Sequence, residues 1–175
     1  NRAHFKHYKL QNDLNSSSMV DSTFVKQGAN SSALVDTFAF SGELVRNNLH
    51  FEFTGMHAEA HMDAITLLKG KSLVDHHTFV DHAVPHCQSN QLYKGIYDEK
   101  SKGVFNGKVM VRKDAQKTNA FQQNSNLLLS DFSSIDTKPQ LEIFADDVAC
   151  SHGCTIGQLD EEALFYMQTR GIPLK

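Results

Sequence analysis

Two thiols and an imidazole lie within five residues near the end of the chain, at Cys150, His152 and Cys154. Thiolate and imidazole are ligands that suit iron, zinc and iron–sulfur centres. Alternate side chains of a strand share a face, so a strand here would put all three on one side. Three ligands leave a tetrahedral site incomplete, and the spacing is not Cys-x-x-Cys. The cluster is a candidate metal site, and the competing interpretation is that the cysteines are buried as apolar side chains.

Histidine is unusually frequent, with 10 residues in 175. His76, His82 and His86 fall at even spacing, which a straight strand would turn to one side, but Pro85 interrupts the run. These three histidines could together bind a metal ion. The alternative is that these histidines pair with neighbouring aspartates or line a turn.

His57 and His61 enclose a glutamate in a short run that resembles a zinc motif. A zinc protease needs its glutamate directly after the first histidine, and here it is Glu59, so that motif fails. The alternation predicts a strand with these residues on a solvated face. At about 3.3 Å per residue the two histidines would lie about 13 Å apart, too far to share one ion.

Asp146 and Asp147 supply the two carboxylates that glycoside hydrolysis requires. Adjacent residues on a strand point in opposite directions, so only a turn could bring them together. The competing interpretation is a turn that ends a strand over 141–145. The sequence contains no glycine-rich phosphate loop and no Gly-x-Ser-x-Gly motif.

A period of two dominates the chain and predicts half-buried strands. The apolar residues that alternate with other residues in this way are Phe38, Phe40, Leu49, Phe51, Phe53, Val109, Val111, Leu141, Ile143 and Ala145. No helical pattern separates the later strands, which excludes an alternating strand–helix fold and leaves an all-β one. A β-sandwich, a jelly roll and a parallel β-helix fit this pattern equally well.

The last residues switch to a helical pattern. Between residues 158 and 170, Leu159, Ala163, Leu164 and Met167 share one helical face, and acidic residues precede them. We therefore expect a β domain over 1–156 and the start of a helical domain over 157–175. Since the chain does not begin with methionine, we also expect it to be a piece of a longer protein.

The composition is that of a single globular domain of 19.6 kDa, with 40% hydrophobic residues and a net charge of −3. The 17 basic against 20 acidic residues argue against nucleic-acid binding. There is no apolar run of membrane-spanning length. An odd number of cysteines, three, does not suit a disulfide framework and favours the cytoplasm.

Several segments together resemble the core of the SufB/SufD family, which belongs to the SUF iron–sulfur cluster assembly machinery. They are residues 82–86, 104–109, 115–118, 126–131, 138–148, 150–153 and 164–172. The resemblance is to the SufD branch. SufB-like chains carry a cysteine at the position of Asn124 and acidic residues at those of Ser151 and Gly153.

This resemblance implies a right-handed parallel β-helix followed by a C-terminal helical domain. It implies a non-catalytic scaffold that pairs with a SufB-like subunit through the β-helix. The helical domain would bind a SufC-like ABC ATPase, and a homodimer of the isolated chain is an alternative pairing. There are two competing functions. One is that of a carbohydrate-active enzyme with a β-helix fold that uses Asp146 and Asp147, and the other is a purely structural role for the β-helix.

The resemblance also implies a site. The family residue matching His152 lies near the interface with the partner, and the residue matching Cys150 lies beside it. We expect these two to contribute to a transient iron or iron–sulfur site shared with the partner, and no cofactor in the isolated chain. Cys154 departs from the family pattern, which has a small residue such as alanine there.

Overall fold

The computed structural model describes residues 2–14 and 16–173, and eleven strands and one helix lie in these ranges. The elements are β1 (His4–Asn12), β2 (Ser18–Gln27), β3 (Ser32–Ser41), β4 (Leu44–Phe53), β5 (Glu59–Leu68), β6 (Leu73–His82), β7 (Gln88–Tyr97), β8 (Lys102–Val111), β9 (Asn119–Leu128), β10 (Ser134–Ile143), β11 (Ala149–Gln158) and α1 (Glu161–Thr169).

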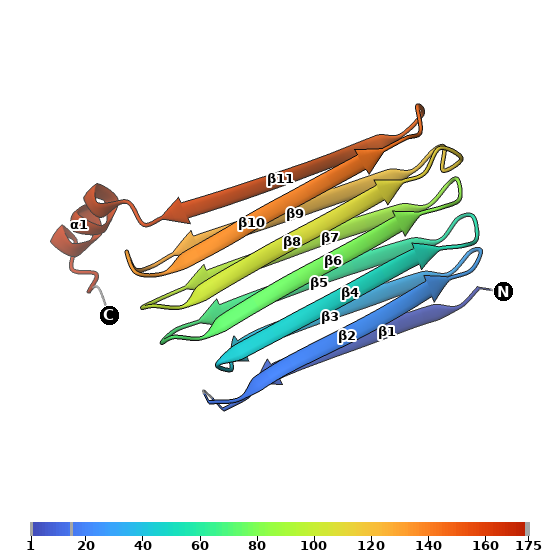
Figure 1. Ribbon diagram of the computed structural model, residues 1–175. Coiled ribbons are helices and arrows are strands. Elements are labelled where there is room, and N and C mark those ends of the chain that lie inside the picture. The colour runs from blue at the N-terminus through green and yellow to red at the C-terminus, as the bar shows by residue number, and fades with distance from the viewer. Residues whose placement is uncertain (1, 15, 174–175) are drawn as a thin grey trace.

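The strands alternate between two sheets. The odd-numbered strands form one sheet in the order β1-β3-β5-β7-β9-β11, and the even-numbered strands form the other in the order β10-β8-β6-β4-β2. Every neighbouring pair is parallel. Each turn of the chain therefore adds one strand to each sheet, and the turns stack as rungs of a parallel β-solenoid (Figure 1). The all-β prediction is confirmed, and the sandwich and the jelly roll are excluded.

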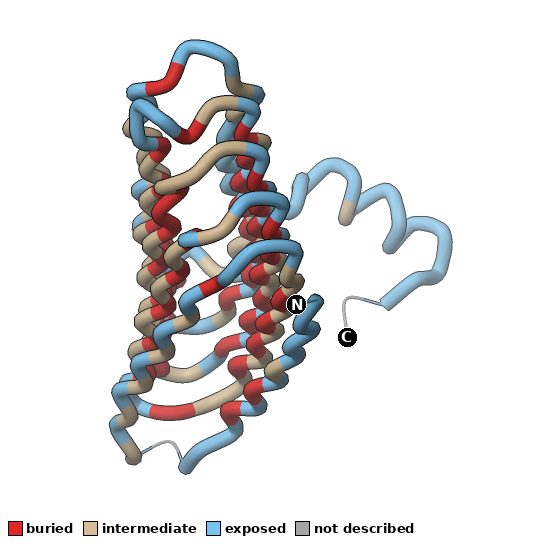
Figure 2. The backbone as a smooth tube through the Cα atoms, turned by 90° about the vertical axis from the view of Figure 1, so that its right-hand side faces the viewer, coloured by how far each residue is buried: buried red, intermediate tan, exposed pale blue. Residues whose placement is uncertain are grey.

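The space between the two sheets holds the core. Leu49, Phe51 and Phe53 of β4 point into it, as do Val109 and Val111 of β8, and all five are buried. Along each wall, buried positions alternate with more exposed ones, as the period of two predicts (Figure 2).

In β3 the alternation has the opposite phase to the one that the phenylalanines indicate. Ala39 is fully buried, whereas Phe38 and Phe40 are only partly buried and face outward. Val35 and Thr37 are buried in the same phase as Ala39. Because a strand keeps its phase up to a bulge, and the register between β1 and β3 shifts only at Phe40, these inward residues decide the orientation of β3 up to Ala39.

The core is partly polar. His76, His82, Gln91, Gln122 and Asn124 are all at most 5% exposed. The register stacks Gln91 on Gln122 in adjacent rungs of the first sheet. Burying a polar side chain costs free energy unless the side chain finds a hydrogen-bond partner.

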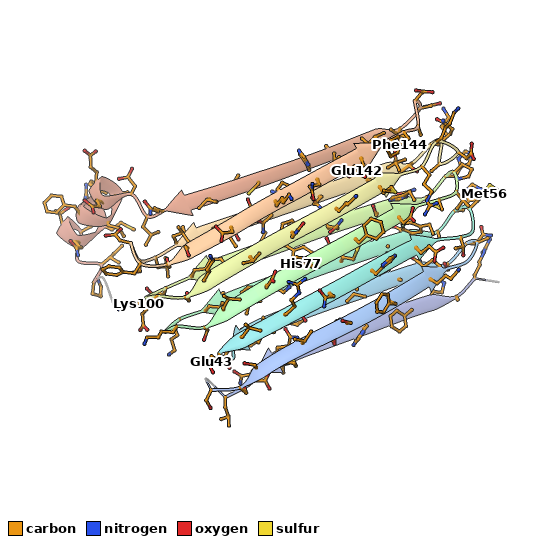
Figure 3. All side chains as sticks on the ribbon, in the orientation of Figure 1. Glu43, Met56, His77, Lys100, Glu142 and Phe144 are labelled. Atoms are coloured by element: carbon orange, nitrogen blue, oxygen red, sulfur yellow. The ribbon has the colours of Figure 1, made fainter. Side chains whose placement is uncertain are left out.

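Ion pairs connect neighbouring rungs on the outward face of the second sheet. Asp75 of β6 accepts from Arg46 Nη1 of β4 at 2.8 Å, and within its own strand it lies 2.9 Å from His77 Nε2. Lys108 Nζ lies 2.8 Å from Glu142 Oε1. His77 and Glu142 are both visible on this face in Figure 3. Opposite charges on adjacent strands favour the register in which the strands pair.

A column of left-handed residues marks one corner of the solenoid. Asn30, His57, His86 and Lys117 occupy the loops that follow β2, β4, β6 and β8, with φ between 56° and 59°. The Lys117 N–H donates to the carbonyl of Asp147 in the next loop, at 2.6 Å. A left-handed backbone is uncommon for residues other than glycine, so its repetition shows that the loops follow one path.

The terminal helix extends away from the solenoid, as Figure 2 shows, and none of its residues is buried. Asp160 caps it by accepting hydrogen bonds from the backbone N–H groups of Glu162 and Ala163 at 2.8 and 3.1 Å. The helix begins later than the sequence pattern indicates, because β11 continues to Gln158. The division into domains at 156/157 stays a prediction.

Candidate functional site

The terminal strand β11 carries the candidate metal ligands at the open end of the solenoid. Its register places Cys150 on Ala120, His152 above Gln122, and Cys154 on Asn124. The three β9 residues are buried and therefore face the interior. Since strands in register present the same face, Cys150, His152 and Cys154 lie in a row on the inward side of the last rung.

Cys150 is the most sheltered of the three. It is half-buried and packs against the hydrophobic core, and its thiol is free. Burial raises the pKa of the Cys150 thiol, with a smaller opposing effect from a hydrogen bond with the Ala120 backbone. The thiol is therefore protonated at neutral pH, and a metal ion would have to displace its proton.

His152 is exposed and lies above a polar floor. Gln122, the residue beneath it, is 2% exposed, and neither atom of its amide has a hydrogen-bond partner among the described residues. Gln91 Nε2, one rung lower, is also unpaired among them. A hollow of about 520 Å³ is lined by these residues together with Cys154. The end of the solenoid thus combines a free imidazole, a thiol and unpaired amides.

Cys154 reaches across to the second sheet. Its sulfur lies 3.0 Å from Thr137 Oγ1 of β10 and 3.8 Å from Asn124 Oδ1. The side chain is exposed and the thiol is free. Cys154 is therefore hydrogen-bonded at the rim, where the two sheets approach each other.

Sequence reasoning missed Gln122 and Thr137, and it named Asn124 only as a position that distinguishes the SufD branch. All three surround the row from below and from the side. They are polar residues in the inward phase of their strands, so a search for apolar alternation passes over them. The signal that could have found Gln122 and Asn124 is the run from Ala120 to Asn126, in which every second residue is small or an amide.

The even-spaced histidines of β6 are not brought together with His86. His76 and His82 point inward and are buried, and they hydrogen-bond to Thr66 Oγ1 at 2.9 Å and to Ser89 Oγ at 2.8 Å, respectively. His86 lies in the loop beyond the strand and is exposed. The interpretation as a turn residue fits His86, whereas the buried pair occupies core positions.

The predicted strand around His61 is confirmed for Glu59, His61 and Asp63 but is wrong for His57, which lies in the loop before β5. Glu59, His61 and Asp63 lie on the outward face of β5, and His61 Nε2 is 2.9 Å from Glu59 Oε1. His57 precedes the strand, in the left-handed column. The two histidines therefore occupy different elements.

Asp146 and Asp147 form the bend after β10, as the turn interpretation predicts. Both are exposed, and the carboxylate of Asp147 forms an ion pair with the Lys117 ammonium group. Across residues 2–14 and 16–173, no three His, Cys, Asp or Glu side chains are close enough together to hold a metal ion. Within these same ranges, no helix is long and apolar enough to cross a membrane.

These features define a class: a parallel β-solenoid whose last rung presents a Cys-x-His row on an edge strand. The model of the family described as "SUF system FeS cluster assembly, SufBD core domain" matches residues 1–175. The chain belongs to this SufBD family.

Curated relatives agree with this assignment. The chain is 36% identical over 172 residues to the iron–sulfur cluster assembly protein SufD of Escherichia coli, and the match covers 97% of this chain. It is 39% identical over 170 residues to a SufBD family protein of Synechocystis, and this match also covers 97% of the chain. It is 38% identical over 176 residues to the chloroplastic protein ABCI7 of Arabidopsis thaliana, and this match covers 99% of the chain. It spans 40%, 38% and 37% of the length of these relatives. The resemblance to the SufD branch is thereby confirmed.

Proposed function

We propose that the protein is a non-catalytic scaffold of iron–sulfur cluster assembly that pairs with a SufB-like subunit through the end of its β-solenoid. A SufC-like ATPase would bind on the side of α1, and ATP hydrolysis by that subunit would drive the rearrangement that exposes the shared site. The observation that carries the proposal is the position of His152 and Cys150 on the terminal strand of a solenoid in a family named for cluster assembly.

The free edges of the last rung support the pairing. Within the described residues, β11 pairs only with β9, and β10 pairs only with β8. Each strand is ten residues long and leaves a row of backbone N–H and C=O groups along its other edge. Such an edge favours pairing with another chain, either a SufB-like subunit or, as the alternative, a second copy of this chain.

The donor set supports a site shared between chains. His152 and Cys150 offer one imidazole and one thiol, and a closed tetrahedral site needs four ligands. In this proposal the partner supplies the remaining ligands, and iron or an iron–sulfur cluster binds only transiently as the cargo of assembly. The three free thiols fit a reducing compartment, and we place the protein in the cytoplasm.

The test uses the full-length protein co-expressed with SufB-like and SufC-like subunits. We expect His152→Ala to reduce the iron–sulfur cluster content of the purified complex by at least about tenfold, because removing even a residue that only supports a metal ligand typically lowers metal affinity by about that factor. Cys150→Ser should have a similar effect, whereas Cys154→Ser should retain assembly. Iron and acid-labile sulfide are measured per complex.

The matched control is His61→Ala, which removes an exposed histidine from the outward face of β5. The thermal unfolding midpoint of each variant shows whether the fold is intact. Unchanged cluster content in folded His152→Ala would remove that residue from the site. Failure of the wild-type chain to copurify with either partner would overturn the scaffold assignment.

A further inference from the structure

A pair of histidines lies outside the terminal rung, in the corner column. The rings of His57 and His86 are stacked, with their centroids 5.1 Å apart and their planes 29° apart. Both side chains are exposed, and they come from loops of adjacent rungs. Two imidazoles are thus held side by side on the surface.

The backbone under both rings is fixed. His57 and His86 share a φ of 59°, and each is followed by a buried residue, Ala58 or Cys87. The His86 N–H also donates to the Gln116 carbonyl at 2.9 Å. The buried neighbours and the backbone hydrogen bond anchor these loops. The spacing of the two histidines is therefore set by the spacing of the rungs, about 4.8 Å.

This spacing suits a metal ion. A tetrahedral zinc ion with Zn–N distances of about 2.0–2.1 Å holds the centres of two bound imidazole rings roughly 5 Å apart. The ring centres of His57 and His86 already have this separation. Because the rings are stacked, binding requires them to turn about their side-chain bonds so that one nitrogen of each faces a common ion.

The surroundings leave room for further ligands. The two rings border a surface hollow of about 410 Å³, whose lining also includes Gln88, Lys117 and Asp147. Lys117 is the nearest cation in the column, and its charge is compensated by the ion pair with Asp147. Water, or an oxygen ligand from a partner molecule, can therefore complete the coordination.

We propose that His57 and His86 form a two-histidine site for a divalent transition-metal ion, with Zn²⁺ as the probe and water in the remaining positions. Imidazole is a ligand for zinc, copper, nickel and iron, and two rings on a rigid scaffold bind as a chelate. Both proposed ligands lie outside the terminal rung, although Ala149 of β11 also lines the hollow, and the proposal does not rest on the proposed scaffold function.

The test is a Zn²⁺ titration of the purified protein, followed by NMR of the histidine side chains. Zn²⁺ is diamagnetic, so the imidazole resonances remain visible and each ring is followed by itself. We expect the resonances of His57 and His86 to shift along one shared isotherm. In His86→Ala, the midpoint of the remaining His57 shift should move to at least tenfold higher Zn²⁺, because the chelate is lost.

The matched control is His50→Ala, which removes a partly exposed histidine from the outward face of β4. It should leave the shared isotherm unchanged. Different isotherms for the two rings would overturn the proposal, as would a midpoint in His86→Ala that moves no further than in the control. Either result would make the pair a stacking contact between rungs.

Discussion

The buried histidines of β6 are neutral core residues. His76 is enclosed by Thr66 and Asn47, and His82 stacks on Phe53 with ring centroids 4.5 Å apart. Burial lowers the pKa of His76 to about 4, and the nearby charges of Lys9 and His77 act in the same direction. Burial also lowers the pKa of His82 to about 4, against the opposing effect of Asp81.

These two residues make the stability of the protein sensitive to acid. An unfolded histidine has a pKa near 6.5, above the folded value, so the unfolded state binds more protons between about pH 6.5 and pH 4. The contribution that each neutral histidine makes to the free energy of unfolding is fully present above pH 6.5. It is lost as the pH falls through this window, by roughly 3 kcal/mol for each histidine. Urea unfolding at a series of pH values measures the loss.

Substitution separates the two contributions. His76→Gln and His82→Gln remove the titrating group, so each should flatten the pH dependence of the free energy of unfolding. The control His61→Gln changes an exposed histidine and should keep the wild-type slope. If both core variants also keep that slope, acid sensitivity arises elsewhere in the molecule.

At the scale of the strand, two glycines make room for one tyrosine. Tyr97 is 3% exposed, and Gly95 and Gly103 lie on either side of its ring. A Cβ atom added at Gly103 would lie 2.4 Å from the Tyr97 ring and 2.5 Å from Ile135. These contacts are too short for the core to accept without rearrangement.

Gly103→Ala should therefore destabilise the fold by about 1–3 kcal/mol, the usual cost of overpacking a core. Chemical denaturation measures the difference from the wild type. Gly153→Ala is the matched control, because it adds the same methyl group to β11 with no heavy atom within 4 Å. Equal stability of Gly103→Ala and the control would show that Tyr97 moves without cost.

Much of the element level could be predicted from alternation. The inward residues of β4 follow directly from the apolar pattern, since Phe51 lies between His50 and Glu52, and those of β8 follow from the repetition of valine at 109 and 111. The phase of β3 could not be predicted from Phe38 and Phe40, because a solenoid wall also exposes apolar side chains on its outward face. Hydrophobicity alone does not distinguish the two faces of such a strand.

The candidate site was predictable in part. The common face of Cys150 and His152 follows from period two once β11 is a strand. Gln122 lies one rung below His152 but 30 residues earlier in the chain, as their pairing shows. Without the register of the solenoid, the sequence contains no signal that joins these two residues, and the same holds for the pairing of His57 with His86.

At the scale of the whole molecule, stability is distributed rung by rung. Within residues 2–14 and 16–173, each inner strand has neighbours on both sides, whereas β1, β2, β10 and β11 have one. In stacked repeats the stability is approximately a sum over neighbouring units, so the two ends open more readily than the centre.

Hydrogen exchange should therefore show a gradient along the solenoid. We expect slow amide exchange in β5, β6 and β7 and faster exchange in the four edge strands. Binding of a SufB-like partner should protect β10 and β11 while leaving β1 and β2 unchanged. Protection at the β1 end alone would place the partner on the wrong end of the solenoid for the proposed function.

The attachment of α1 to the carboxyl end of β11 gives the solenoid a direction of mechanical weakness (Figure 1). The hydrogen bonds between β9 and β11 run along the solenoid axis, across the strands. A force on α1 along the strand loads these bonds together in shear, and the strand resists. A force along the solenoid axis breaks these hydrogen bonds one after another, beginning at the end of β11 that is attached to α1. Tension in that direction would detach β11, with Cys150 and His152 on it, and leave β9 in place.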